Sequence, residues 1–170
     1  MAKVKRMKGK GTYIFFKELG GAPERTEISK TASVLLNQNL INGRTLDYGC
    51  GQGFDADQLN WESFDPYYRP NLPEGKFDTI VVNHVLNILT KNSRQSLYKK
   101  VDDLLDQHGK VYFSVARNIP KEGKHGPRKR LQNYIILDLQ VVYEDDIEAI
   151  YVWEKGAAID DLTKEFEDQF

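Results

Sequence analysis

The stretch LDYGCGQG, residues 46–53, decides the fold of this chain. Its first residues resemble the end of a short buried strand, and Gly49, Gly51 and Gly53 follow at alternate positions. Glycines directly after a strand let the backbone turn sharply and approach a ligand closely, because they lack a β-carbon. Asp47 places a carboxylate beneath this turn. An ordinary tight loop would also use such glycines, so the flanking segments have to support a ligand site.

The spacing of the glycines indicates the kind of ligand. Dinucleotide sites use G-x-G-x-x-G because a pyrophosphate must lie on the N-terminus of the following helix. Here the spacing is G-x-G-x-G, and an acid precedes it. This arrangement favours a ligand with an amino-acid portion and a positive charge, and it disfavours a nucleotide-binding dehydrogenase.

The segments around this turn alternate between helical and extended patterns. Ser29 is the expected N-cap of a helix that ends before Asn42, and a brief helix is expected over residues 55–59. A longer helix is predicted over residues 93–106, with Gly109 as its C-terminal stop. Strands are expected at residues 45–48, 61–64, 77–82 and 111–116, and as a pair between Tyr134 and Trp153.

Strands that alternate with helices predict a compact α/β fold: a Rossmann-like, doubly wound and mainly parallel sheet. Ligands of such sheets bind beyond the carboxyl ends of the strands, where the strand order reverses. The 170 residues fit one such domain. We expect a basic N-terminal extension over residues 1–28, the domain over residues 29–155, and an acidic C-terminal segment over residues 156–170, either helix or tail.

Composition narrows the class of protein. The chain is 40% hydrophobic and 29% charged, as in globular proteins. No apolar run approaches the roughly 18 residues of a membrane span, and no apolar stretch follows the basic start as in a secretory signal. A cytoplasmic protein without membrane partners is therefore expected. Cys50 is the only cysteine, which excludes an intrachain disulfide and a cysteine-based zinc site, and no metal is expected.

The basic residues are concentrated in two segments. Residues 1–10 carry five basic side chains and no acid. Residues 117–130, from Arg117 to Arg130, carry six basic side chains against Glu122 alone. Such segments are either a polyanion-binding face or solvated tails and loops, and the sequence leaves both open.

A second acid stands at the spacing expected of a nucleoside site. Asp65 lies 18 residues after Asp47, close to the roughly 20 residues at which such folds place an acid on the ribose hydroxyls. Pro66, Tyr67 and Tyr68 follow, and either tyrosine could lie against a purine because aromatic faces stack on bases. The alternatives are a turn-forming aspartate before Pro66 and plain surface packing of the tyrosines.

Polar residues interrupt the apolar run that begins at Phe77. Asn83 could hydrogen-bond an amino group or a cofactor. His84 could accept a proton, because an unperturbed histidine titrates at about pH 6.5. Alternatively, His84 only caps or packs the short helix that follows. Asn87 lies in the same segment.

These segments together resemble class I S-adenosylmethionine-dependent methyltransferases. Residues 47–53 resemble motif I of that family, Asp65 matches the acid that ends its second strand, and residues 77–87 resemble its fourth strand and the following loop. The resemblance covers about residues 29–153. It is nearest to small methyltransferases found beside bacterial DNA-modification systems.

The resemblance implies S-adenosyl-L-methionine as the cofactor. The implied cofactor contacts are Asp47, Tyr48, Gly49, Cys50, Gly51, Gly53, Asp65, Pro66, Tyr67 and Asn83. The implied catalytic residues, which would orient the methyl acceptor, are Asn83, His84 and Asn87. The basic segment from Arg117 to Arg130 would emerge at the cofactor edge of the sheet, so together with the basic N-terminus it favours DNA or RNA as acceptor.

The sequence also departs from the family pattern. Eleven residues separate Asp65 from Phe77, too few for a normal third strand with its helix, so the middle region is shortened. The Asp-Pro-Pro-Tyr motif of amino-directed DNA methyltransferases is missing. No Pro-Cys pair exists, which excludes attack on cytosine through a cysteine. A non-catalytic cofactor-binding or partner subunit is therefore the alternative to an enzyme, and the sequence indicates no oligomeric state.

Overall fold

The computed structural model describes residues 21–126 and 130–166, so the basic residues at positions 1–10 and 128–129 lie outside the described part. The elements in chain order are α1 (Lys30–Asn37), β1 (Thr45–Tyr48), α2 (Phe54–Leu59), β2 (Glu62–Phe64), β3 (Phe77–Asn83), the 3-10 turn η2 (Leu86–Ile88), α3 (Lys91–Leu104), β4 (Leu105–Ala116), β5 (Lys124–His125), β6 (Leu131–Gln132), β7 (Gln140–Glu144) and β8 (Glu148–Glu154).

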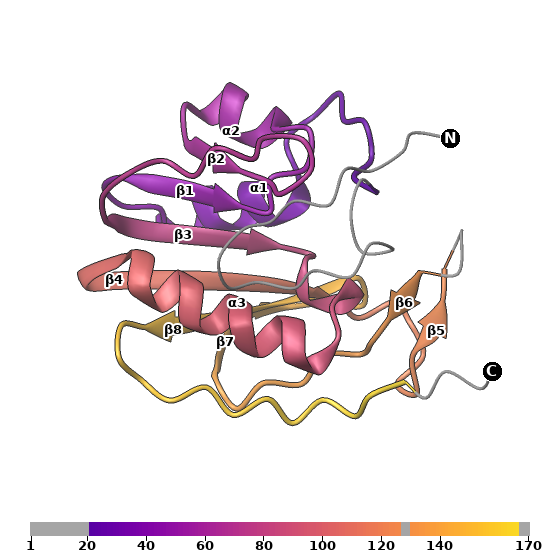
Figure 1. Ribbon diagram of the computed structural model, residues 1–170. Helices are drawn as coiled ribbons and strands as arrows, with labels where there is room; N and C mark the ends of the chain where they lie inside the picture. Colours follow the sequence, from indigo (N-terminus) through magenta and orange to yellow (C-terminus); the bar gives the residue numbers. More distant parts are fainter. Residues whose placement is uncertain (1–20, 127–129, 167–170) are drawn as a thin grey trace.

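A six-stranded sheet in the order β2-β1-β3-β4-β8-β7 forms the centre of the molecule (Figure 1). Strands β2, β1, β3 and β4 are parallel, whereas β8 runs antiparallel to both of its neighbours. The chain moves outward from β1 to β2 and then returns to β3 on the other side of β1. The strand order therefore reverses between β1 and β3, where ligands of such sheets bind. This topology confirms the predicted doubly wound, mainly parallel fold.

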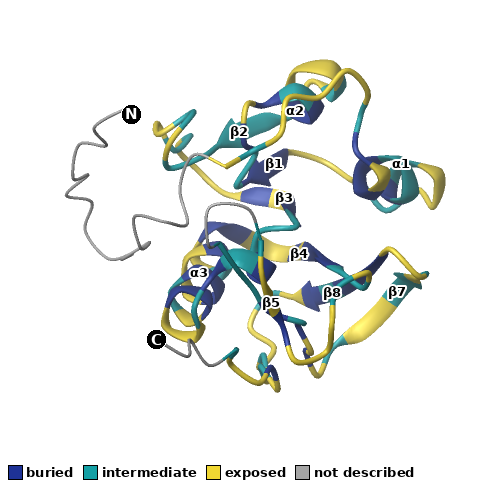
Figure 2. Cartoon of the chain, turned by 90° about the vertical axis from the view of Figure 1, so that its right-hand side faces the viewer, coloured by how far each residue is buried: buried dark blue, intermediate teal, exposed yellow. Residues whose placement is uncertain are grey.

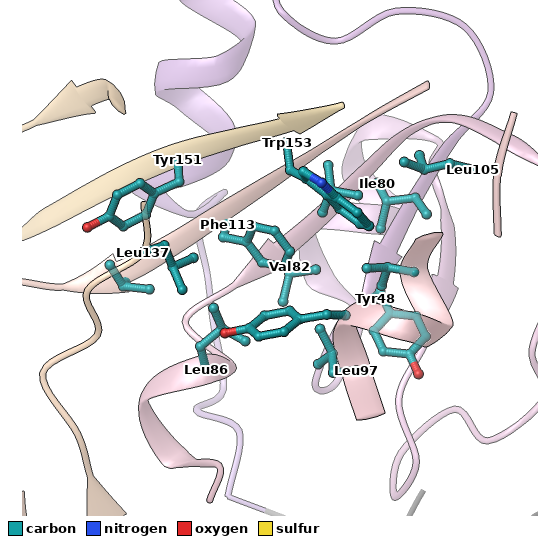
Figure 3. Packing of buried hydrophobic residues seen from close by; sticks show 14 of the residues in the cluster. Tyr48, Ile80, Val82, Leu86, Leu97, Leu105, Phe113, Leu137, Tyr151 and Trp153 are labelled. Carbon is teal, nitrogen blue, oxygen red and sulfur yellow. The ribbon is translucent and has the colours of Figure 1, made fainter. Parts of the chain in front are cut away.

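The sheet is covered on both faces (Figures 1 and 2). On one face, α3 contributes Leu97 to a cluster with Val82, Phe113 and Trp153 from β3, β4 and β8 (Figure 3). On the other face, Leu35 of α1 belongs to a cluster with Val81, Tyr112 and Ile150. Neighbouring residues of a strand point to opposite faces, so β3 and β4 need apolar residues at successive positions. This is why their sequences read as continuous apolar runs.

The segment between β2 and β3 is short, as predicted. Residues 65–76 contain no helix and no strand beyond the isolated bridge between Asp65 and Arg69. In place of a further strand and helix, the Arg69 guanidinium connects this region: it pairs with Asp57 of α2 at 2.7 Å and donates to the Gln52 carbonyl at 2.9 Å. Arg69 thereby ties the β2 side of the sheet to the glycine turn.

Gly109 does not end the long helix, so this prediction is wrong. Helix α3 ends at Leu104 and β4 begins at Leu105, so Gly109 lies inside the strand. The pairing of β3 with β4 is irregular between Phe77 and Thr79. A β-carbon at Gly109 would lie 2.9 Å from the Phe77 carbonyl oxygen. Glycine is needed there because the two strands approach each other closely. In the sequence, a glycine shortly after a helical pattern looks the same as a helix C-cap.

The described C-terminal residues contain no helix and pack against α3. Their anchor is Arg94, which is fully buried and pairs with Asp161 at 2.7 Å and with Glu165 at 3.0 Å. Burial opposes ionisation of Asp161, but hydrogen bonds from Arg94, Thr163 and Tyr98 outweigh it and lower the pKa of that carboxyl. No helix in the described part of the chain has the length and apolarity that a membrane crossing needs.

The buried ion pair yields a stability prediction. Arg94→Met leaves the Asp161 carboxylate buried without its cation, so we expect a loss of about 3 kcal/mol in the free energy of unfolding. Arg44→Met breaks an exposed pair with Glu62 and serves as the control, with a much smaller expected loss. Urea denaturation measures both. Equal losses in the two variants would contradict the anchoring role of Arg94.

Candidate functional site

A cavity of about 650 Å³ opens at the carboxyl ends of β1 and β3. The glycine turn and the residues directly after β2 and β3 form much of its wall. Lining residues are Gly21, Ala22, Pro23, Arg25, Asp47, Tyr48, Gly49, Cys50, Gly51, Gln52, Gly53, Phe54, Asp55, Phe64, Asp65, Pro66, Tyr68, Asn83, His84, Val85, Ile88, Leu89, Ser93, Leu97, Arg130 and Gln132. The volume suits a small molecule of the size of a nucleoside cofactor.

The glycine turn can be built only from glycine. Gly49, Gly51 and Gly53 have φ angles of 86°, 58° and 86°, in the left-handed region that other residues rarely adopt. A β-carbon on Gly49 would lie 2.5 Å from Val85 Cγ2, and one on Gly51 would lie 2.5 Å from Ala22 Cβ. The backbone therefore forms this part of the cavity wall, where no side chain could fit.

Asp47 presents a buried carboxylate to the cavity. Its side chain lies at 3% exposure, and within the described residues its Oδ1 has no hydrogen-bond partner. Burial, followed by the nearby carboxylate of Asp55, raises the pKa of Asp47 to about 7. An unpaired buried acceptor is costly, and a cationic group placed in the cavity would satisfy it. Asp47 therefore favours a positively charged ligand.

Asp65 holds two loops together beside the cavity. Its Oδ1 accepts hydrogen bonds from the backbone N–H groups of Tyr67 at 2.8 Å and Tyr68 at 2.9 Å, and its Oδ2 accepts from Gly51 N at 3.0 Å. The two readings of Asp65 are thus compatible, since it forms a turn and also lines the cavity. Tyr68 lines the cavity, whereas Tyr67, at 39% exposure, does not.

Asn83 belongs to a polar chain that joins four elements. Its Nδ2 donates to Ser29 Oγ at 2.9 Å, and its Oδ1 accepts from Ser114 Oγ at 2.9 Å. Ser29 Oγ in turn donates to Asp55 Oδ2 at 2.6 Å. Ser29 also caps α1 by accepting from Ala32 N, which confirms the predicted N-cap. The sequence showed this capping role alone, because the contacts with Asn83 and Asp55 join distant segments.

His84 lies at the cavity wall in a strained conformation. Its φ is +54°, which is unusual for any residue other than glycine. Its backbone N–H donates to the carbonyl oxygen of Ser114 at 3.0 Å and to Ser114 Oγ at 3.2 Å. The imidazole Nε2 lies 3.4 Å from Oε2 of Glu148, a buried residue that the sequence analysis did not single out. Glu148 follows a run of exposed-type acids near a turn, so its burial gave no sequence signal.

Asn87 does not line the cavity. Its Nδ2 donates to the Asn133 carbonyl at 2.8 Å, and its Oδ1 accepts from Ala116 N at 3.0 Å. These bonds use both ends of the buried amide to connect the η2 turn with the ends of β4 and β6. The structure therefore brings Asn83 and His84 together at the cavity and gives Asn87 a place in the supporting framework.

The described part of the basic segment has two environments. Arg117 is 8% exposed and is held by Glu144 at 3.1 Å, by the Ile135 carbonyl at 2.9 Å and by the Tyr151 hydroxyl at 2.7 Å. Lys121 and Lys124 are exposed, and Arg130 lines the cavity. The segment does reach the cavity edge, but Arg117 is engaged inside the protein.

Comparison with known proteins places the fold. The sequence matches no protein-family model and no curated protein. Among solved structures it is similar to the 1,6-didemethyltoxoflavin-N1-methyltransferase of Burkholderia thailandensis, crystallised with 1,6-didemethyltoxoflavin and S-adenosylhomocysteine. Identity is 17% and the TM-score 0.52, over 74% of this chain and 77% of that chain.

Two further methyltransferases match less closely. The glycopeptide N-methyltransferase MtfA complexed with sinefungin is 16% identical, with a TM-score of 0.46 over 81% of this chain and 74% of that one. The magnesium protoporphyrin IX methyltransferase of Synechocystis is 14% identical, with a TM-score of 0.45 over 74% of this chain and 76% of that one. At 17% identity it is the fold that the toxoflavin enzyme shares with this chain, and this agrees with the predicted Rossmann-like, doubly wound sheet.

The buried Asp47 carboxylate predicts a pH-dependent stability difference. Its pKa of about 7 in the fold exceeds its ordinary 3.8, so the folded state loses stability as pH rises from about 4 to 7. Asp47→Asn removes this cost, and we expect the variant to become more stable than the natural protein by about 2 to 4 kcal/mol at pH 8. Urea denaturation at pH 5 and pH 8 measures the difference.

Asp57→Asn is the matched control for this experiment. The Arg69 guanidinium lowers the pKa of Asp57, so this carboxylate contributes stability above its ordinary pKa and loses it as pH falls. The control substitution should therefore destabilise slightly at pH 8. If Asp47→Asn also destabilised the protein at pH 8, the Asp47 carboxylate would have a partner that offsets its burial.

Proposed function

We propose that this protein is an S-adenosylmethionine-dependent methyltransferase. The observation that carries the proposal is the buried Asp47 Oδ1, which lies beneath a turn of left-handed glycines and has no partner in the described part of the chain. It lies at the strand-order reversal of a sheet with the class I methyltransferase fold. A site with this charge and shape suits a ligand that carries positive charge and an amino-acid portion.

The residues present fit the cofactor. Asp47 would pair with the ammonium group of its methionine part, and the bare backbone of residues 49–53 would let that part approach closely. Asp65 would accept hydrogen bonds from the ribose hydroxyls, since its Oδ2 accepts only one hydrogen bond within the described residues. We place Tyr68 rather than Tyr67 against the adenine, because Tyr68 is the tyrosine at the cavity.

When bound, the cofactor would supply an electrophilic methyl group on a positively charged sulfur. The chain would contribute alignment and exclusion of water, which account for much of the acceleration of a two-reactant step. Asn83 would hold the cavity floor through its bonds to Ser29 and Ser114. His84 would receive the proton of the acceptor, since its imidazole lies at the cavity wall.

The acceptor that the sequence suggested, DNA or RNA, is part of this proposal. It is supported by exposed Lys121 and Lys124 on the segment that brings Arg130 to the cavity. Arg117 has no place in it, because its guanidinium is buried among internal partners. The toxoflavin enzyme holds a small heterocycle, so a small-molecule acceptor is the competing possibility.

Cofactor binding should depend on the protonation of Asp47. At pH 8 the carboxylate is ionised and can pair with a cation, whereas at pH 6 it is mostly protonated because its pKa is about 7. We expect calorimetry to show S-adenosylmethionine binding about tenfold more weakly at pH 6 than at pH 8. Asp47→Asn should bind weakly at both pH values, and Asp57→Asn should follow the natural protein.

The same titration tests the proposed function. Absence of heat at pH 8 would refute a cofactor site in this cavity. Binding that is lost in Asp65→Ala, followed by transfer of a labelled methyl group to DNA, RNA, protein or metabolite pools, would establish the enzyme. Binding without transfer to any of these pools would support the non-catalytic subunit, which the short segment between β2 and β3 favours.

The nucleic-acid acceptor predicts salt-sensitive binding. Affinity for a short DNA or RNA should fall steeply between about 50 and 200 mM salt, because phosphate contacts release counterions. Lys121→Glu with Lys124→Glu should weaken binding and reduce the salt slope by about two. Fluorescence anisotropy measures both the affinity and the salt slope. The control is the double variant Lys110→Glu/Glu154→Lys, which reverses an exposed ion pair away from the cavity and leaves the net charge unchanged. Salt-independent affinity would rule out a phosphate-gripping acceptor site.

A further inference from the structure

Glu148 is a buried acid whose burial the proposed function does not yet explain. It begins β8, opposite Ala116 at the end of β4, and has no exposed surface. Within the described residues, its Oε1 has no hydrogen-bond partner. A buried carboxylate with an incomplete set of partners costs stability, and replacement by an apolar residue would often be tolerated. Because stability does not explain an acid at this position, we consider the contacts of its other oxygen, Oε2.

Oε2 of Glu148 faces two side chains. It accepts a hydrogen bond from Thr31 Oγ1 at 2.6 Å, and it lies 3.4 Å from Nε2 of His84. The neighbouring Lys30 does not neutralise Glu148, because its Nζ pairs with Asp145. Thr31 is 1% exposed and carries no charge, so it holds the carboxylate in place without discharging it. Among the described residues, the imidazole is thus the cation-forming group in contact with this acid.

The backbone of His84 is held as firmly as the acid. Its left-handed φ of +54° is unfavourable for a residue with a β-carbon and persists only where neighbouring contacts impose it. The two bonds from its N–H to Ser114 impose it here. Ser114 thus fixes the backbone of His84 while Glu148 lies against the ring. The side chain is 35% exposed and lines the cavity.

We propose that Glu148 is a positioning residue for His84. Its Oε2 accepts a hydrogen bond from Nε2–H of the imidazole, which keeps the neutral ring in the Nε2–H tautomer and leaves Nδ1 as the atom that accepts a proton. The separation of 3.4 Å is long for a hydrogen bond, as catalytic contacts often are before a substrate is bound. This proposal rests on the methyl-transfer function above and extends it to the class of acceptor.

The acceptor must be a nucleophile that carries a proton, an amine N–H or a hydroxyl O–H. As its nitrogen or oxygen bonds to the methyl carbon, the carbon–sulfur bond breaks and leaves its electron pair on sulfur. The proton of the acceptor passes to Nδ1 of His84. The positive charge lost by the sulfur therefore reappears on the imidazolium, which faces the Glu148 carboxylate. Charge and atoms balance without a further reactant.

The tautomer of His84 tests the proposal without any acceptor. The chain has three histidines, so long-range nitrogen–proton correlation spectra of the imidazoles resolve His84, His108 and His125, with His84→Asn to assign the first. In the natural protein at pH 8, we expect His84 as the Nε2–H tautomer. An Nδ1–H tautomer there would overturn the proposal, whatever the cofactor does.

Variants of Glu148 complete the experiment. Glu148→Met removes the acceptor at similar volume and should leave His84 in a mixture of tautomers, whereas Glu148→Gln keeps an acceptor oxygen and should retain the Nε2–H form. Glu154→Met, at the exposed other end of β8, is the matched control and should change nothing. The signals of His108 and His125 should stay unchanged in every variant. A His84 tautomer that ignores Glu148→Met would refute the positioning role.

Cofactor binding separates this proposal from the proposed function. Glu148→Met should bind S-adenosylmethionine with unchanged affinity, and on an identified acceptor its kcat should fall at least tenfold while KM for the cofactor stays constant. A loss of affinity equal to the loss of kcat would instead place Glu148 in cofactor binding. If the natural protein binds no cofactor but shows the expected tautomer response, the dyad stands and the methyltransferase proposal fails.

Discussion

The structure depends on the Asp47 carboxylate, which is buried at the point where β1 passes into a turn of glycines and whose Oδ1 has no hydrogen-bond partner among the described residues. Asp47 cannot escape to solvent, because β1 lies between two parallel neighbours and all four of its residues are buried. Gly49, Gly51 and Gly53 in the turn above it have no side chains that could cover the carboxylate. Stability alone would not retain such a group, since burial raises the pKa of Asp47 to about 7. A cationic ligand would pair with the carboxylate and offset the unfavourable free energy of its burial. Functional sites often hold groups that destabilise the protein until the ligand binds.

The rest of the domain holds that turn in place. Phe64 at the end of β2 accepts hydrogen bonds from Gly49 N and Cys50 N, and Asp65 accepts from Gly51 N. The Arg69 guanidinium packs where a β-carbon on Gly53 would lie. The shortened segment after β2 thus retains the contacts that shape the turn although it lacks a third strand and helix. Under the proposed function, the part of the site for the methionine portion of the cofactor would therefore be complete, while the part for its adenine would be formed by a loop.

A second polar layer lies at the ends of β3, β4 and β8. Ser114 holds the backbone of His84 and bonds the Asn83 amide, while Thr31 reaches Glu148 from α1. Each of these side chains is supported by a residue from another element, so their geometry depends on the packing of the whole sheet. Rigid support of this kind is what a reacting group needs for its orientation to be maintained.

The sequence by itself determined the sheet, the glycine turn, the Ser29 cap and the positions of Asp47, Asp65, Asn83 and His84 at one sheet edge. These features follow from local rules, because strand burial, left-handed turns and helix caps involve residues close together in the chain. Only the tertiary structure decided that Tyr68 rather than Tyr67 meets the cavity, that Asn87 and Arg117 are used internally, and that Gly109 lies within a strand. It also placed Glu148 beside His84, with a bond to Thr31 that spans 117 positions. Contacts of that range arise from the packing of a helix on a sheet, and no local pattern in the chain encodes them.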